Sequence, residues 1–185
     1  MENNSHMESF EKRLKRFRDG HPIEIIDTLL NSVDSHFNNE IRLTVKNDSY
    51  QTTLLFLGIH AVALTISEGL FGKEKFAGYK VFLKSFVDGD TSDTKFSAIA
   101  KMIHDWRNIL AHQWLGSIGH TIGYDYNLIT GWENRGGVTF INPRIYAEHY
   151  LNAFAAGGKI WRYTELLDEE EMEAAKERLI RKYER

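Results

Sequence analysis

The sequence predicts an all-α protein, a helical bundle of five or more helices with a small β-hairpin inserted around residues 120–141. Two observations lead to this fold class. Apolar residues recur at intervals of three or four along most of the chain, which is the period of an amphipathic helix. Between residues 120 and 141 the interval changes to two, the period of a strand. A length of 185 residues with 42% hydrophobic content fits a single domain over residues 1–185.

The chain begins with a polar tail, residues 1–7, which we exclude from the fold because Ser5-His6-Met7 matches a common tag remnant. Residues 8–19 form a first helix, and Gly20 ends it. A basic cluster surrounds the apolar residues of this helix, and two interpretations stay open: a solvated helix face, or an arm that contacts RNA. The cluster consists of Lys12, Arg13, Lys15, Arg16 and Arg18.

Two long helices follow. Pro22 suits the first turn of an amphipathic helix that continues to about Lys46. The next helix, over residues 50–71, is apolar on nearly all sides, as expected for the central helix of a bundle. His60 and Glu68 are among its few polar residues. Because the sequence shows no third metal ligand at a suitable spacing, we expect hydrogen-bonded core roles for both.

A shorter helix over residues 76–86 precedes a polar turn, residues 88–93, which offers N-caps for the next helix. That helix runs over residues 94–114, and Gly116 and Gly119 end it. It carries the candidate site described below.

The segment 120–141 predicts a β-hairpin or a three-stranded meander, because apolar residues alternate from Ile122 to Leu128 and residues 138–141 form a second strand run. Pro143 then begins a helix that ends before Gly157-Gly158. The last helix, over residues 165–182, has acidic residues at its start and basic residues at its end, the order that the helix dipole favours.

Composition restricts the function. A formal net charge of −3 argues against a general nucleic-acid coat, so any contact with RNA must be local. The absence of cysteine excludes disulfides, thiolate zinc sites and cysteine nucleophiles. The longest apolar run, residues 54–66, is too short to span a bilayer and the N-terminus lacks a signal peptide. We therefore expect a cytoplasmic protein that does not associate with membranes.

The candidate site is the stretch KMIHDWRNILAHQW, residues 101–114. At about 100° per residue, one face of this helix is apolar and the opposite face is polar. Ala100 and Ala111 interrupt the polar face, and their small side chains would permit the close approach of a second copy. The polar face carries Lys101, His104, Asp105, Arg107, Asn108 and His112.

Within this face, Arg107-Asn108-x-x-x-His112 resembles the motif of the HEPN superfamily, in which an arginine followed by a polar residue precedes a histidine by four to six positions. The resemblance covers about residues 22–115. It implies a small helical bundle that acts as a homodimer and, in many members, cleaves RNA without a metal or another cofactor. A second match, from Arg144 to His149, lacks the polar residue after the arginine.

The residue types of the motif suit this chemistry. A histidine titrates near neutral pH, so His112 is the candidate acid and base for the 2′-hydroxyl and the leaving 5′-oxygen. Arg107 is a permanent cation that can stabilise the charged phosphate, and Asn108 can orient either partner. We therefore predict Arg107, Asn108 and His112 as catalytic residues, His104 and Lys101 as residues that bind flanking phosphates of the substrate, and no metal ligands.

Arg107 and His112 lie about 140° apart on an ideal helix, so one copy cannot readily close both side chains around a single phosphate. Two copies that face each other across a two-fold axis can, which predicts a homodimer through this helix. In some HEPN-like proteins, a partner enzyme modifies a tyrosine two residues after the motif histidine. This chain has Trp114 there, so we do not expect that form of control.

Two functions stay open. The first is a metal-independent endoribonuclease, acting as a toxin or an antiviral defence effector, with RNA as substrate and an antitoxin or other regulatory protein as partner. The second is a catalytically inactive, dimeric HEPN-type module that binds RNA, a nucleotide or a protein partner. The corresponding alternative for the motif residues is structural: Arg107 pairs with a carboxylate such as Asp105, and His112 stabilises the C-terminus of its helix.

Overall fold

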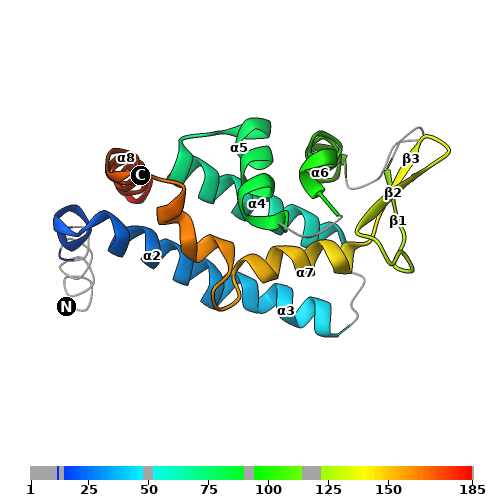
Figure 1. The fold of residues 1–185 in the computed structure, drawn as a ribbon, viewed down its shortest axis with the longest axis horizontal. Coiled ribbons are helices and arrows are strands. Elements are labelled where there is room, and N and C mark those ends of the chain that lie inside the picture. The colour runs from blue at the N-terminus through cyan, green and yellow to red at the C-terminus, as the bar shows by residue number, and fades with distance from the viewer. Residues whose placement is uncertain (1–11, 13–14, 48–51, 90–93, 114–121, 185) are drawn as a thin grey trace.

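The structure is a computed structural model in which the protein is mostly helical, with one small three-stranded sheet (Figure 1). The described residues are 12, 15–47, 52–89, 94–113 and 122–184, without the side chains of residues 111–113 and 183. Within them seven α-helices have defined bounds, which confirms the prediction of five or more. Our expectations for the tail at residues 1–7 and for Trp114, Gly116 and Gly119 concern positions outside this part of the chain.

The predicted helix from Pro22 to Lys46 is present, with an irregularity at its centre. It consists of α2 (Pro22–Ser32), a π-helical turn (Val33–Phe37) and α3 (Asn38–Lys46). The side chain of His21 caps α2 by accepting a hydrogen bond from the backbone N–H of Ile23, and Pro22 occupies the first turn.

The π-helical turn has a cause in the sequence. Core-facing residues of this segment recur every four positions from Leu29 to Val45. On an ideal α-helix each step of four residues drifts by about 40°, so the four steps would carry the stripe about 160° around the helix. A π-helical turn holds more residues per turn and reverses much of that drift. Ile41 therefore faces the core, where its side chain is buried.

Helix α4 (Thr52–Phe71) is the central helix, and it contacts α5, α6, α7 and α8. Its 20 residues and mean hydropathy of 1.8 would suffice for a membrane span, which corrects the expectation that the apolar run is too short. However, 56% of its most apolar window is buried inside the protein, so the core of the bundle accounts for its composition.

The two polar residues that the sequence singles out in α4 have different environments. His60 is fully buried, as expected for a core histidine. Glu68 is not a core residue: its side chain is 40% exposed and pairs with Lys182 at 2.6 Å. The prediction of a core role was therefore wrong for Glu68.

Helix α5 (Lys75–Phe82) continues into a second π-helical turn (Leu83–Val87). A 3-10 turn (Phe96–Ile99) then leads into α6 (Ala100–Gln113), the helix that carries the HEPN-like motif. Ile103 and Leu110 are buried, which confirms the apolar face. Ala100 is also buried, only 1% exposed in the core of its own chain, so it cannot provide the dimer contact that we expected of it.

The segment around residues 120–141 forms the sheet, with strands β1 (Ile122–Tyr124), β2 (Trp132–Arg135) and β3 (Val138–Ile141). β2 and β3 form a hairpin whose turn is Gly136-Gly137, both with positive φ, but β2 lies outside the two strand runs that the sequence predicted. The order is β1-β3-β2, and β1 pairs with β3 in parallel. The sheet is therefore not a meander: β1, which follows α6 in the chain, lies beside the strand that leads into α7.

Helix α7 (Pro143–Ala153) lies beside α3 and α4, and Asn142 caps it. A 3-10 segment (Lys159–Glu165) leads to α8 (Glu169–Tyr183), which begins later than predicted because Asp168 and Glu171 form a capping box. The sheet stands at one end of the molecule and α8 at the other (Figure 1). Buried residues from these helices and from the sheet form one core cluster.

Candidate active site

Helix α6 presents its two outermost charged residues to solvent as an ion pair. Both carboxylate oxygens of Asp105 lie 2.6 Å from the Lys101 ammonium, and the Lys101 and Asp105 side chains are 66% and 51% exposed. Lys101 also lies over the ring of Phe76, 5.9 Å from its centroid. The partner of Asp105 is therefore Lys101 and not Arg107, which removes the structural alternative in which Arg107 pairs with Asp105.

Arg107 is half-buried and is held by the neighbouring amide. Its Nη1 donates to Oδ1 of Asn108 at 2.9 Å, which is the contact that an orienting role of Asn108 requires. Its Nε is buried and makes no hydrogen bond with any described residue. A buried donor without a partner is rare in native proteins and often marks a functional group. The guanidinium is therefore oriented without being fully occupied by the protein.

His104 does not belong to a purely solvated face. Its Nδ1 lies 2.9 Å from Nε2 of His60, which comes from α4, and the two ring centroids are 5.0 Å apart. The prediction placed His104 beside Lys101 on the polar face of the helix, and the structure places its half-buried ring against His60, in the contact between α4 and α6.

Aromatic rings form the floor of this region. The His60 ring packs on Tyr79 with centroids 4.4 Å apart, and the Tyr79 hydroxyl is hydrogen-bonded to that of Tyr146 at 2.8 Å. Trp106 of α6 stacks on Tyr124 of β1 with centroids 4.9 Å apart. The Tyr124 hydroxyl is buried without a hydrogen-bond partner among the described residues, and this burial raises the pKa of Tyr124.

Burial and positive charge both act on the two histidines. Burial, followed by the charges of Arg107 and His104, lowers the pKa of His60 from 6.5 to about 3. Burial also lowers the pKa of His104, helped by Arg107 and Lys101 and opposed by Asp105. Both imidazoles are therefore neutral at pH 7, and His104 is not the cation that a simple electrostatic phosphate contact would use.

The structure places part of the predicted set of residues. Arg107, Asn108 and His104 are adjacent on α6, and Lys101 stands one turn before His104. The backbone of His112 belongs to the last turn of α6, and its side chain lies outside the described residues. Among the residues that the structure describes, no group of three or more His, Asp or Glu side chains is placed to hold a metal ion.

Two members of the site were missed in the sequence. His60 stood out only as a polar residue inside an apolar helix, and its partner is 44 positions away. Tyr124 stood out only as one position of an alternating strand. The signal that could have raised His60 is that an isolated imidazole in a core helix needs a hydrogen-bond partner, and α6 offers the nearest supply of polar side chains.

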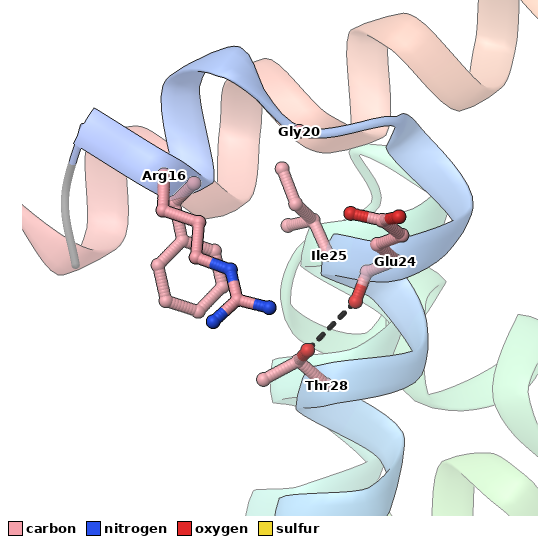
Figure 2. A pocket seen from close by; sticks show the side chains of 6 residues that line it. Arg16, Gly20, Glu24, Ile25 and Thr28 are labelled. Atoms are coloured by element: carbon pink, nitrogen blue, oxygen red, sulfur yellow. Dashed lines mark hydrogen bonds between the residues drawn. The ribbon is translucent and has the colours of Figure 1, made fainter.

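A hollow lies away from this site, between residues 16–20 and α2. It measures about 600 Å³, and Figure 2 shows Arg16 extending into it opposite Thr28 and Glu24. Arg18, from the same basic cluster, pairs with Glu184 at 2.5 Å. The cluster therefore contributes at least one contact within the fold, and the hollow combines a cation with a carboxylate.

Comparison with known proteins adds no relative: no family model, no curated protein and no solved structure matches this chain. The structure is that of a helical protein with a small sheet. His104 and Arg107 of α6 and His60 of α4 form a cluster where these two helices meet. The HEPN resemblance rests on the motif residues of α6 alone.

Proposed function

We propose that the protein is a metal-independent endoribonuclease of the HEPN type, acting in the cytoplasm as a toxin or an antiviral defence effector. The observation that carries the proposal is the state of Arg107, whose guanidinium is oriented by Asn108 and retains a buried Nε without a partner among the described residues. A guanidinium held in this way is preorganised for a phosphate, because its charge need not break other contacts to bind.

In the proposed reaction, the 2′-oxygen of a ribose attacks the neighbouring phosphorus as its proton passes to His112, and the bond from phosphorus to the 5′-oxygen breaks. The protonated His112 returns this proton to the leaving 5′-oxygen, and the products are a 2′,3′-cyclic phosphate and a 5′-hydroxyl. Arg107 stabilises the negative charge on the phosphoryl oxygens in the transition state. Each atom and proton is accounted for without a metal or a cofactor.

A homodimer remains part of the proposal because positions 107 and 112 lie about 140° apart on an ideal helix. Arg107 of one protomer would act with His112 of the other, and an antitoxin or another regulatory protein would restrain the dimer. Subunit mixing tests this arrangement. A mixture of Arg107→Ala and His112→Ala proteins contains dimers with one intact composite site, so cleavage should return in the mixture, whereas each variant alone is inactive.

The decisive experiment is RNA cleavage in excess chelator. We expect cleavage by the wild-type protein, cyclic phosphate ends, and loss of activity in Arg107→Ala and His112→Ala. Arg144→Ala is the matched control, because it removes an exposed arginine from α7 at the second sequence match. His149→Ala completes that pair but requires a melting curve, since the His149 ring packs against Phe96 with centroids 5.3 Å apart. Undetectable cleavage by the wild type would remove the catalytic proposal.

One observation favours the second function, a catalytically inactive module that binds RNA, a nucleotide or a protein partner. Both described imidazoles of the site have a lowered pKa and are neutral at pH 7, which suits hydrogen bonding to a ligand more than proton transfer. RNA binding without cleavage, lost in Arg107→Ala, would establish this function in place of the first.

A further inference from the structure

The contact between His60 and His104 determines where the protons of both rings reside. His60 is fully buried, its Nε2 lies 2.9 Å from Nδ1 of His104, and its Nδ1 has no partner among the described residues. One nitrogen of this short contact must donate and the other must accept. Three arrangements are possible, and their energies differ.

A charged His60 would bury an ion and an unpaired N–H donor together, which is the most costly arrangement. A neutral His60 with its proton on Nδ1 would still bury a donor without an acceptor, at a cost of about 1–3 kcal/mol. A neutral His60 with its proton on Nε2 donates to His104 and leaves only an acceptor unpaired, which protein interiors contain more often than an unpaired donor. The third arrangement is therefore the most stable.

This arrangement fixes His104 as well. Because Nδ1 of His104 accepts the hydrogen bond from His60, the single proton of a neutral His104 must reside on Nε2. The two nitrogens of an imidazole point in different directions, so this N–H points away from His60. His104 then offers a neutral donor whose tautomer and orientation are set by a residue of another helix.

Arg107 stands three residues after His104, one turn along the same helix and about 60° around it. Both side chains are half-buried, and the buried Nε of Arg107 has no partner among the described residues. Arg107 and His112 are separated by about 140°. A neutral N–H donor and a guanidinium on one side of α6 can contact the same oxyanion within one chain, whereas positions 107 and 112 of an ideal helix share no such side.

We propose that His60 is a positioning residue that holds His104 as a neutral Nε2–H donor, and that His104 and Arg107 of one chain together bind a single phosphodiester group. The identity of the ligand rests on the proposed function. The assignment changes the expected role of His104 from a cation that contacts a flanking phosphate to a neutral donor at the phosphate that Arg107 contacts. No proton is transferred by either histidine of this pair.

The tautomer can be measured without RNA, by nitrogen chemical shifts of the histidine side chains in the wild-type protein. We expect an unprotonated Nδ1 and a protonated Nε2 for His104 at neutral pH. His60→Leu removes the donor, so His104 should become a mixture of tautomers. His60→Gln places an amide N–H near the position of the lost Nε2 and should restore the wild-type spectrum. A protonated Nδ1 on His104 in the wild type overturns the proposal, whatever the variants do.

The ligand is tested with 2′-O-methyl RNA, which lacks the attacking hydroxyl and therefore reports binding alone. Loss of one hydrogen bond to a charged phosphate should weaken binding about 10- to 100-fold in His104→Ala. We expect His60→Leu to weaken binding as well and His60→Gln to restore it. His36→Ala and Arg144→Ala remove an exposed histidine and an exposed arginine elsewhere and should leave the Kd unchanged.

Failure of this inference and failure of the ribonuclease proposal give different results. If the wild type binds 2′-O-methyl RNA with dependence on His104 but cleaves no natural RNA, the catalytic proposal is refuted and the phosphodiester site stands. If the wild type cleaves RNA while His104→Ala binds with unchanged Kd, the phosphodiester site is refuted and the catalytic proposal stands.

Discussion

Among the described residues, the polar side chains around the buried Asn38 and those around the buried His60 form two clusters that differ in how completely their hydrogen bonds are made. In the Asn38 cluster, Tyr150 donates to Asn38 at 2.7 Å, Asn38 donates to Asp34 at 3.0 Å, and Arg42 donates to the same carboxylate at 2.5 Å. In the His60 cluster, which consists of His60, His104, Arg107 and Tyr124, three buried polar atoms have no partner among the described residues.

The difference distinguishes polar groups that hold helices together from polar groups that are available to bind a ligand. A fully satisfied buried network fixes the packing of the elements it joins, here α7 to α3 and the preceding π-helical turn. A partly satisfied network costs stability and is retained where a ligand completes it. Substitutions in the Asn38 cluster should therefore reduce stability with little change in activity. Substitutions in the His60 cluster should reduce activity with little change in stability at pH 7.

The largest expected effect is the loss of activity in Arg107→Ala. Removing one preorganised donor to a transition-state oxyanion lowers the rate by about 10²–10³-fold, and the fold should be retained because Arg107 makes one described hydrogen bond. Initial cleavage rates and thermal melting measure the two effects. Arg42→Ala, which removes an arginine from the Asn38 cluster, should lower the melting temperature and leave the rate of the remaining folded protein unchanged. A lower melting temperature in Arg107→Ala together with a lower cleavage rate in Arg42→Ala would contradict the distinction between the two clusters.

The next effect is a dependence of stability on pH that originates at His60. The pKa of His60 is about 3 in the folded protein, against 6.5 for an unperturbed histidine such as that of an unfolded chain. Between these values the unfolded chain binds a proton that the folded protein does not, so stability falls as pH decreases, by up to about 1.4 kcal/mol per pH unit. His104 and Arg107 face His60 and oppose its protonation.

Urea unfolding of the wild type and of His60→Leu measures this contribution. At pH 7 the two proteins differ by packing and hydrogen bonding alone. At about pH 5 the wild type should have lost more stability than the variant, because the variant has no imidazole at this position to protonate. An equal loss in both proteins would assign the pH dependence to other groups.

A smaller effect comes from single hydroxyl groups. Tyr150→Phe removes the donor to Asn38 and should lower the free energy of unfolding by about 1–2 kcal/mol. Tyr124→Phe is the matched variant in the other cluster: its hydroxyl has no partner among the described residues, so its loss should leave stability unchanged or raise it. Chemical denaturation of the two variants compares them directly, and equal destabilisation would contradict the distinction between the clusters.

The smallest effect is expected at the edge of the site. Lys101 and Asp105 are exposed and form an i,i+4 pair, so Lys101→Ala should change the free energy of unfolding by no more than about 0.5 kcal/mol. Its effect on RNA binding, measured as the slope of log Kd against log salt, should be a decrease of at most about one unit. A decrease in this slope of more than one unit would restore Lys101 as a main phosphate contact.

The fold was predictable where local pattern decides it. The long apolar stretch of α4 and the proline at the start of α7 locate these helices within a few residues. The parallel pairing of β1 with β3 was not predictable, because strands of three and four residues carry no information about which neighbour they join. The burial of Ala100 was missed because an alanine fits either face of an amphipathic helix.

The candidate site was predictable only along α6. Spacing on one helix places Arg107, Asn108 and His104 near one another, and the contact between Arg107 and Asn108 is present. The inward contact of His104 depends on which helix packs against α6, and no spacing within α6 contains that information. Sequence reasoning therefore found the residues of the motif and missed the partner that determines the protonation of one of them.

The π-helical turn between α2 and α3 bears on how related sequences should be recognised. A π-helical turn is equivalent to one extra residue in an α-helix, so a relative without it would have one residue fewer between Ser32 and Asn38. Deleting one residue there in this chain would rotate α2 against α3 by about 100° and move Asn38 away from Tyr150. A search for distant relatives should allow a single-residue gap at this point, because an ungapped alignment places one of the two helices out of phase.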